Sequence, residues 1–176
     1  EIIQNPRVTL DLIDLRSYDD YTYRHSVNVA VISTVIGINM QLNRLALDEL
    51  SIAAILHDIG KRRIDPKIIN KKGKLTPEEY TEVKHHSEYG YEMVKSRIDL
   101  SAKIKNAILL HHENEDGSGY PKGLKGNQIF IYAKIIHVAD VFDALTAKRP
   151  YKKAYAQSEA AEYLMGSCDR MFDREV

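Results

Sequence analysis

Apolar residues recur at helical spacing along most of the chain. Between residues 20 and about 41, Val27, Val31, Val35 and Ile38 follow the i, i+4, i+7 rhythm of a helix face. A strand would instead alternate apolar and polar residues with a period of two, and we find no such run, no βαβ pattern and no internal repeat. The pattern therefore predicts a single all-α domain.

Residues typical of helix ends indicate where further helices begin. Thr76 as N-cap, Pro77 at the first helical position and Glu79 three residues after the cap predict a helix that runs to about residue 95. The remaining helices are expected after Pro6, at 48–57, at 102–111 behind the N-cap Ser101, at 131–146 and from Ser158 onward. A glycine-rich stretch at 113–128 predicts a long loop, and loops of this length inside a compact domain are usually functional.

Composition narrows the class of protein. A chain of 176 residues, 44% of them apolar, is long enough to bury the core of one domain. The 25 Lys and Arg balance the 25 Asp and Glu, which argues against a strongly basic protein that binds nucleic-acid polymers. The single cysteine, Cys168, excludes an internal disulfide framework, and no apolar run approaches the roughly 20 residues that span a bilayer. We expect a cytoplasmic domain without membrane contact, excised from a longer regulatory protein.

Histidines and carboxylates gather where apolar helices end. His57 and Asp58 directly follow the apolar run 51–56, and His111 and His112 end the run 107–110 in the same way. Burying a histidine with a carboxylate is costly unless the charge is neutralised, and a divalent cation does this well. Neighbouring helix residues point about 100° apart, so the other ligands must come from other helices.

Each of these pairs alone fits a helix end that reaches into solvent equally well. His137 and Asp140 add an i, i+3 pair on a third helix. Together the pairs favour a polynuclear metal site. Gly60 ends the helix and is expected to let backbone come close to a ligand, while Lys61 brings a mobile positive charge that suits a phosphate. By itself this lysine would be interpreted as complementing the helix dipole.

Two longer motifs identify a family. Residues 57–61 read His-Asp-Ile-Gly-Lys, an HDxGK motif, and His111-His112-Glu113 with residues 116–121 reads as HHE…DGxGYP. From about residue 18 to 172 the chain resembles the HD-GYP domain, a branch of the HD phosphohydrolase superfamily. The resemblance implies that residues 1–176 form one HD-type domain of about six to eight helices around a metal site. It also implies hydrolysis of the bacterial second messenger cyclic di-GMP to linear pGpG and, in some members, to GMP.

The resemblance further implies a set of metal ligands. One ion would be held by His25, His57, Asp58 and Asp140, and the other by Asp58, His86, His111 and His112. Asp58 would thus bridge the two ions, with His85 and His137 outside the pattern. Members with three metals carry a glutamate where this chain has Tyr21, so we expect two divalent transition-metal ions, iron or manganese.

Other residues take roles in substrate binding and catalysis by the same resemblance. Lys61, Arg149 and Lys152 would contact the substrate phosphates, with Lys61 and Asp58 also catalytic. Asp143 would orient ligands or water. The loop residues Gly119, Tyr120 and Pro121 are associated with catalysis and with contacts to partner domains, including diguanylate cyclase domains. A sensor or receiver domain is expected in the same full-length chain.

Two other functions fit the same residues. The first is an HD phosphohydrolase that acts on another cyclic or linear nucleotide, such as cyclic GMP-AMP. The second is a catalytically silent nucleotide-binding or scaffold module, against which the presence of all the ligand positions argues. For an enzyme, metals that share a carboxylate would activate a water for in-line attack on the phosphodiester.

Overall fold

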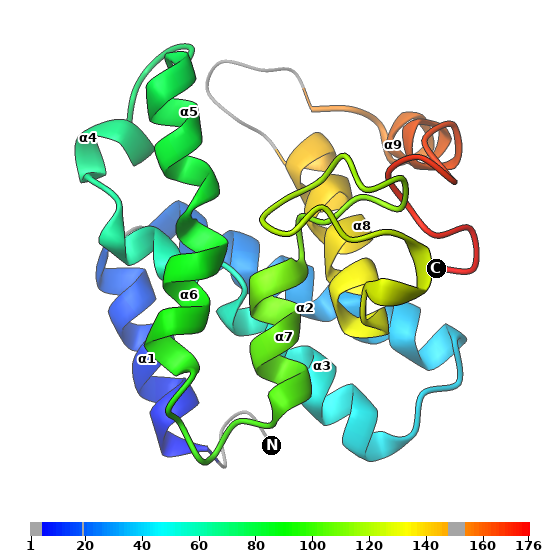
Figure 1. Ribbon diagram of the computed structural model, residues 1–176, viewed down its shortest axis with the longest axis horizontal. Helices are drawn as coiled ribbons and strands as arrows, with labels where there is room; N and C mark the ends of the chain where they lie inside the picture. The colour runs from blue at the N-terminus through cyan, green and yellow to red at the C-terminus, as the bar shows by residue number, and fades with distance from the viewer. Residues whose placement is uncertain (1–4, 19, 148–153) are drawn as a thin grey trace.

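The structure is a computed structural model that describes residues 5–18, 20–147 and 154–176, and these residues form helices with no extended strand (Figure 1). The α-helices are α1 (Pro6–Tyr18), α2 (Asp20–Asn39), α3 (Arg44–Leu56), α4 (Pro66–Ile69), α5 (Pro77–Lys84), α6 (His86–Val94), α7 (Ala102–Leu110), α8 (Ile131–Thr146) and α9 (Gln157–Met165). Two 3₁₀ turns, η2 (Ile59–Arg63) and η3 (Gly126–Gln128), lie between them. The predicted all-α class is confirmed.

The core lies between α2, α3, α7 and α8. Helix α2 packs along both α3 and α8, and α3 also packs on α7. Val29, Leu50, Ile108 and Ile135 are fully buried where these helices meet. Because α3, α5 and α7 all end near the middle of the molecule, the residues that follow them are brought together there (Figure 1).

Helix α2 buries a different face from the one its large apolar residues predict. Val31, Val35 and Ile38 are 59%, 53% and 57% exposed. The buried face carries small or polar residues instead: Thr22, His25, Ser26, Val29, Ala30 and Ser33. Small side chains allow α2 to lie close to α3 and α8, so the helix is oriented by close packing and by His25 rather than by its largest apolar side chains.

The helix predicted from residue 76 to about 95 begins as expected but is interrupted. Thr76 and Glu79 form a reciprocal capping box, with Pro77 in the first turn. Helix α5 then ends at Lys84, and α6 begins at His86. The His86 ring binds the Val83 carbonyl oxygen through Nδ1 at 2.7 Å, so a side chain engages the last turn of α5.

Gly60 permits a close approach of backbone to backbone. A Cβ atom at this position would lie 1.9 Å from the His86 carbonyl oxygen and 2.4 Å from the Gly90 nitrogen. The neighbour of Gly60 is therefore the first turn of α6, and not a ligand as the sequence led us to expect. The contact fixes η2 against the helix that begins with His86.

We predict that Gly60→Ala destabilises the protein by about 1–3 kcal/mol or more, because the added methyl group meets backbone atoms that cannot turn aside. Urea unfolding measures the change. Gly166→Ala is the matched control, since its backbone is right-handed (φ −68°) and its Cβ would come no closer than 3.3 Å to another atom. Equal stability of the two variants would contradict the prediction.

Candidate metal site

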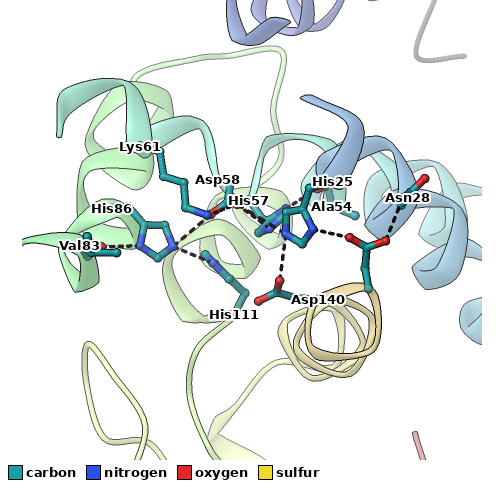
Figure 2. A network of polar contacts seen from close by, with 11 residues as sticks. His25, Asn28, Ala54, His57, Asp58, Lys61, Val83, His86, His111 and Asp140 are labelled. Carbon is teal, nitrogen blue, oxygen red and sulfur yellow. Dashed lines mark hydrogen bonds and ion pairs between the residues drawn. The ribbon is translucent and has the colours of Figure 1, made fainter. Parts of the chain in front are cut away.

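Three histidines that follow helix ends are held in the same way, and Figure 2 shows the contacts of His57 and His86. In each of them the ring binds, through Nδ1, the carbonyl oxygen three residues back: His57 to Ala54 at 2.7 Å, His86 to Val83 at 2.7 Å and His111 to Ile108 at 2.8 Å. A carbonyl oxygen only accepts, so Nδ1 must carry the hydrogen. When such a ring is neutral, its lone pair is on Nε2, which faces the centre of the site.

His25 reaches the same centre from the interior of α2. Its Nδ1 lies 2.7 Å from Asp143 Oδ2, and Asn28 Nδ2 donates to the other oxygen of Asp143 at 2.9 Å. This contact leaves Nε2 of His25 3.0 Å from Asp140 Oδ1 (Figure 2). Asp143 thus orients a histidine, as the resemblance implied, and Asn28 in turn orients Asp143.

The buried carboxylate of Asp58 lies between the histidines. Its Oδ1 is 3.4 Å from His86 Nε2, and its Oδ2 is 3.3 Å from His57 Nε2 and 3.7 Å from His25 Nε2. Lys61 Nζ lies 2.5 Å from the same Oδ2. The carboxylate of Asp58 therefore faces two sets of imidazoles and forms an ion pair with the ammonium group of Lys61.

The two halves of the site differ in protonation. Burial opposes the charge on His25, but hydrogen bonds to Asp140 and Asp143 outweigh it and raise its pKa to about 9. Burial lowers the pKa of His86 to about 4, and burial together with neighbouring imidazoles keeps the pKa values of His111 and His112 well below the usual value. The His25 half thus carries a proton, while the other half is neutral imidazole.

Neutral rings leave lone pairs that need a positive partner. Nε2 of His86 and Nε2 of His111 are 3.1 Å apart, and both rings hold their hydrogen on Nδ1. Nε2 of His57 is buried 3.3 Å from Asp58 Oδ2 and has no hydrogen-bond partner among the described residues. A cation between such nitrogens removes the repulsion and satisfies the lone pairs. Among the described residues, two groups have donor atoms within 4.8 Å of one another and could each hold an ion: His25, His57, Asp58, and His86, His111, His112.

Each group contains three of the four residues expected for one ion; Asp140 lies beside the first group through His25, and Asp58 lies beside the second through His86. His85 lies outside both groups and pairs with Glu88 at 2.9 Å. His137 is buried beside His112 and Phe172. Arg149 and Lys152, the expected phosphate contacts, lie outside the residues that the structure describes.

The glycine-rich loop packs against His112. Tyr120 N–H donates to the His112 carbonyl at 3.1 Å, and the Tyr120 ring stacks on the His112 ring with centroids 4.7 Å apart. A Cβ at Gly119 would lie 2.4 Å from the same carbonyl oxygen, so only glycine allows this contact. Gly119 and Tyr120 therefore support a candidate ligand directly.

Glu113 binds the backbone of the loop segment that follows Pro121, a role that the sequence did not reveal. Its carboxylate is 3% exposed and accepts from Lys122 N–H at 2.6 Å and Leu124 N–H at 2.9 Å. Both oxygens are thus used by the backbone after Pro121. The adjacency of Glu113 to the histidine pair His111 and His112 was the available signal.

A buried ion cluster joins the loop to the end of the chain. Lys134 Nζ lies 3.1 Å from Glu115 and 2.6 Å from Asp173. Glu115 N–H also donates to the Met171 carbonyl at 3.2 Å, so the loop and the residues after α9 lie side by side (Figure 1). No spacing in the sequence indicated these partners of Lys134.

A pocket of about 430 Å³ opens onto the candidate ligands. It is lined by Lys61, Tyr80, Val83, His86, His112, Asn114, Ser118, Gly119, Tyr120, His137, Asp140, Val141 and Met171. One wall is thus charged or imidazole, and the wall formed by α5 carries an aromatic and an aliphatic residue. The arrangement suits an anion with an uncharged flat part.

Comparison with known proteins finds similar sequences. A family model described as the HD domain matches residues 8–176. A cyclic di-GMP phosphodiesterase of Pseudomonas aeruginosa is 38% identical over 99% of the chain and 42% of its own length. A 3′3′-cGAMP-specific phosphodiesterase of Vibrio cholerae is 42% identical over 73% of the chain and 25% of its own length. The chain therefore spans less than half the length of these relatives.

A solved structure agrees with the fold. An HDG"Y"P protein from Bdellovibrio bacteriovorus superposes with a TM-score of 0.71 at 22% identity, over 86% of this chain and 48% of that one. None of the described helices has the length and apolarity needed to cross a membrane.

Replacing Glu113 by glutamine should loosen the loop, because the amide nitrogen of glutamine would face a backbone N–H that now has an acceptor. We expect a loss of about 1–3 kcal/mol in unfolding free energy and faster proteolysis within residues 113–128. Glu92→Gln, an exposed residue paired with Lys95, is the control and should change stability by less than about 1 kcal/mol. Unchanged proteolysis of Glu113→Gln would refute the role of Glu113 in fixing the loop.

Proposed function

The chain belongs to the HD domain family, as its motifs indicated, and we propose that it is a metal-dependent phosphodiesterase that hydrolyses cyclic di-GMP. The observation that carries the proposal is the position of Asp58, whose two oxygens face two separate sets of imidazole nitrogens. Such a carboxylate suits a bridge between two cations. The relatives named for this activity support the substrate.

In this proposal the two groups of donors hold two ions. His25, His57 and Asp140 hold one ion, His86, His111 and His112 hold the other, and Asp58 contacts both. The donor set is imidazole and carboxylate without thiolate, which suits iron or manganese. When bound, the ions supply an activated water and accept charge from the phosphate oxygens. The protein fixes the donors in advance through the backbone carbonyls and Asp143.

Lys61 is the phosphate-binding and proton-donating residue of the proposal. Burial opposes its charge, but the carboxylate of Asp58 outweighs burial and raises the pKa of Lys61, so it stays an ammonium. It lines the pocket, where it can neutralise a non-bridging phosphate oxygen and give a proton to the leaving 3′ oxygen. Arg149 and Lys152 are proposed as further phosphate contacts on the strength of the motif alone.

The direct test is incubation with cyclic di-GMP after loading with Mn²⁺ or Fe²⁺, with products separated by chromatography. Formation of pGpG, and of GMP on longer incubation, supports the proposal. Cyclic GMP-AMP is assayed in parallel, because a relative 42% identical is named for that substrate. Binding of nucleotide without hydrolysis under any metal would indicate a silent binding module.

The proposal extends to partners in the full-length protein. We propose that a sensor or receiver domain regulates this one, since the chain matches less than half of its relatives' length. The tip of the GYP loop, where Lys122 and Gly123 are exposed, is the surface proposed for contact with diguanylate cyclase domains. Elution of a complex with such a domain in gel filtration, lost in Lys122→Glu, is the expected result.

Metal content separates a shared ligand from an unshared one. We expect about two ions per chain in the wild type, about one in His25→Ala, and fewer than one in Asp58→Ala, because the carboxylate of Asp58 faces both groups. Elemental analysis of chelator-free preparations measures this, with Glu88→Ala as a control that alters only the exposed partner of His85. Full occupancy in Asp58→Ala would eliminate the bridging assignment.

Proton release gives a second test. At pH 7.5 His25 is protonated in the metal-free protein because its pKa is about 9, and ligation requires the neutral ring. Metal binding should therefore release about one proton, tighten as pH rises towards 9, and level off above it. Calorimetric titration with Mn²⁺ in two buffers of different ionisation enthalpy measures the release. The release should vanish in His25→Ala, whereas release in that variant as in wild type would be inconsistent with this ligand set.

A further inference from the structure

Tyr80, on α5, is one of the residues that line the pocket. Its side chain is 54% exposed, yet it lines the same pocket as Lys61, His86 and Asp140. The other tyrosine of the pocket, Tyr120, has its ring stacked on His112 and is largely buried. Tyr80 is thus the aromatic ring with the most free surface among the described residues that line the pocket.

A cation already lies against the face of this ring. Lys84 Nζ is 5.5 Å from the centroid of the Tyr80 ring and 6.0 Å from that of Tyr120. The one-turn spacing on α5 keeps the ammonium beside both rings. An aromatic face with a neighbouring ammonium suits a planar group that carries hydrogen-bond acceptors, as a purine base does.

The chemistry of the pocket places the two parts of a nucleotide on different walls. A phosphodiester belongs at Lys61 and the histidine–carboxylate groups, where charge can be neutralised. The base of the same nucleotide is uncharged and flat, and it suits contact with aromatic and aliphatic side chains. The wall formed by Tyr80 and Val83 offers this, within the same pocket of about 430 Å³.

We propose that Tyr80 is a specificity residue on which a purine base of the substrate stacks while the phosphodiester lies at the metal site. The inference rests on the proposed function for the identity of the nucleotide. The alternative is a surface tyrosine that serves only as the partner of Lys84.

Kinetics on cyclic di-GMP test the proposal. Loss of one base–aromatic stack is expected to raise KM roughly 5- to 150-fold in Tyr80→Ala, with little change in kcat and unchanged metal content. Tyr80→Phe keeps the ring and should restore KM. Tyr163→Ala is the matched control, since Tyr163 is 42% exposed on α9 and does not line the pocket. An unchanged KM, or loss of metal in Tyr80→Ala, would overturn the proposal.

A binding measurement separates this inference from the proposed function. The chain has no tryptophan, so Tyr80→Trp introduces a single tryptophan, whose emission can be excited selectively, at the ring position. On the metal-loaded protein, GMP should quench its emission by stacking, whereas ribose 5-phosphate, which lacks the base, should not. Tyr163→Trp should respond to neither. If GMP does not quench the emission of Tyr80→Trp, stacking is refuted, even if cyclic di-GMP is hydrolysed. Quenching by GMP without hydrolysis of cyclic di-GMP would refute only the proposed reaction.

Discussion

The hydrogen bond from imidazole Nδ1 to the backbone carbonyl three residues back is the interaction on which the site depends. It recurs at His57, His86 and His111, and it ties the direction of each ring to the last turn of a helix. Because that bond fixes the hydrogen on Nδ1, the free lone pair on Nε2 is fixed as well. The positions where α3, α5 and α7 end therefore decide the geometry of the donors. A rigid helix sets these positions more accurately than a loop does.

The same arrangement carries a cost when no cation is bound. Two Nε2 lone pairs 3.1 Å apart repel, and a buried Nε2 on His57 has no hydrogen-bond partner among the described residues. Folding brings these groups together nonetheless, because the core of α2, α3, α7 and α8 packs around them. Any ion that binds the folded protein and not the unfolded chain relieves this cost and stabilises the fold by mass action. Stability and metal affinity are thus linked through the same atoms.

The sequence predicted what depends on near neighbours and missed what depends on distant ones. The capping box of Thr76 and Glu79 and the adjacency of His57 and Asp58 are local patterns, and the helices and candidate ligands follow from them. Asn28 and Asp143 are 115 residues apart, and Lys134 and Asp173 are 39 apart, so neither pair has a signature in spacing. The buried face of α2 was predicted wrongly because small residues pack it, while Val31 and Val35 are exposed.

The charges in the site also link metal binding to the role of Lys61. In the metal-free protein the carboxylates of Asp58 and Asp140 are offset by the ammonium of Lys61 and the proton of His25. Both positive charges lie beside carboxylates that a bound cation would contact. Cations held at Asp58 would weaken the attraction of its carboxylate for Lys61, whose ammonium lines the same pocket. In the proposed function, metal binding would therefore favour contact between Lys61 and a phosphate oxygen of the substrate.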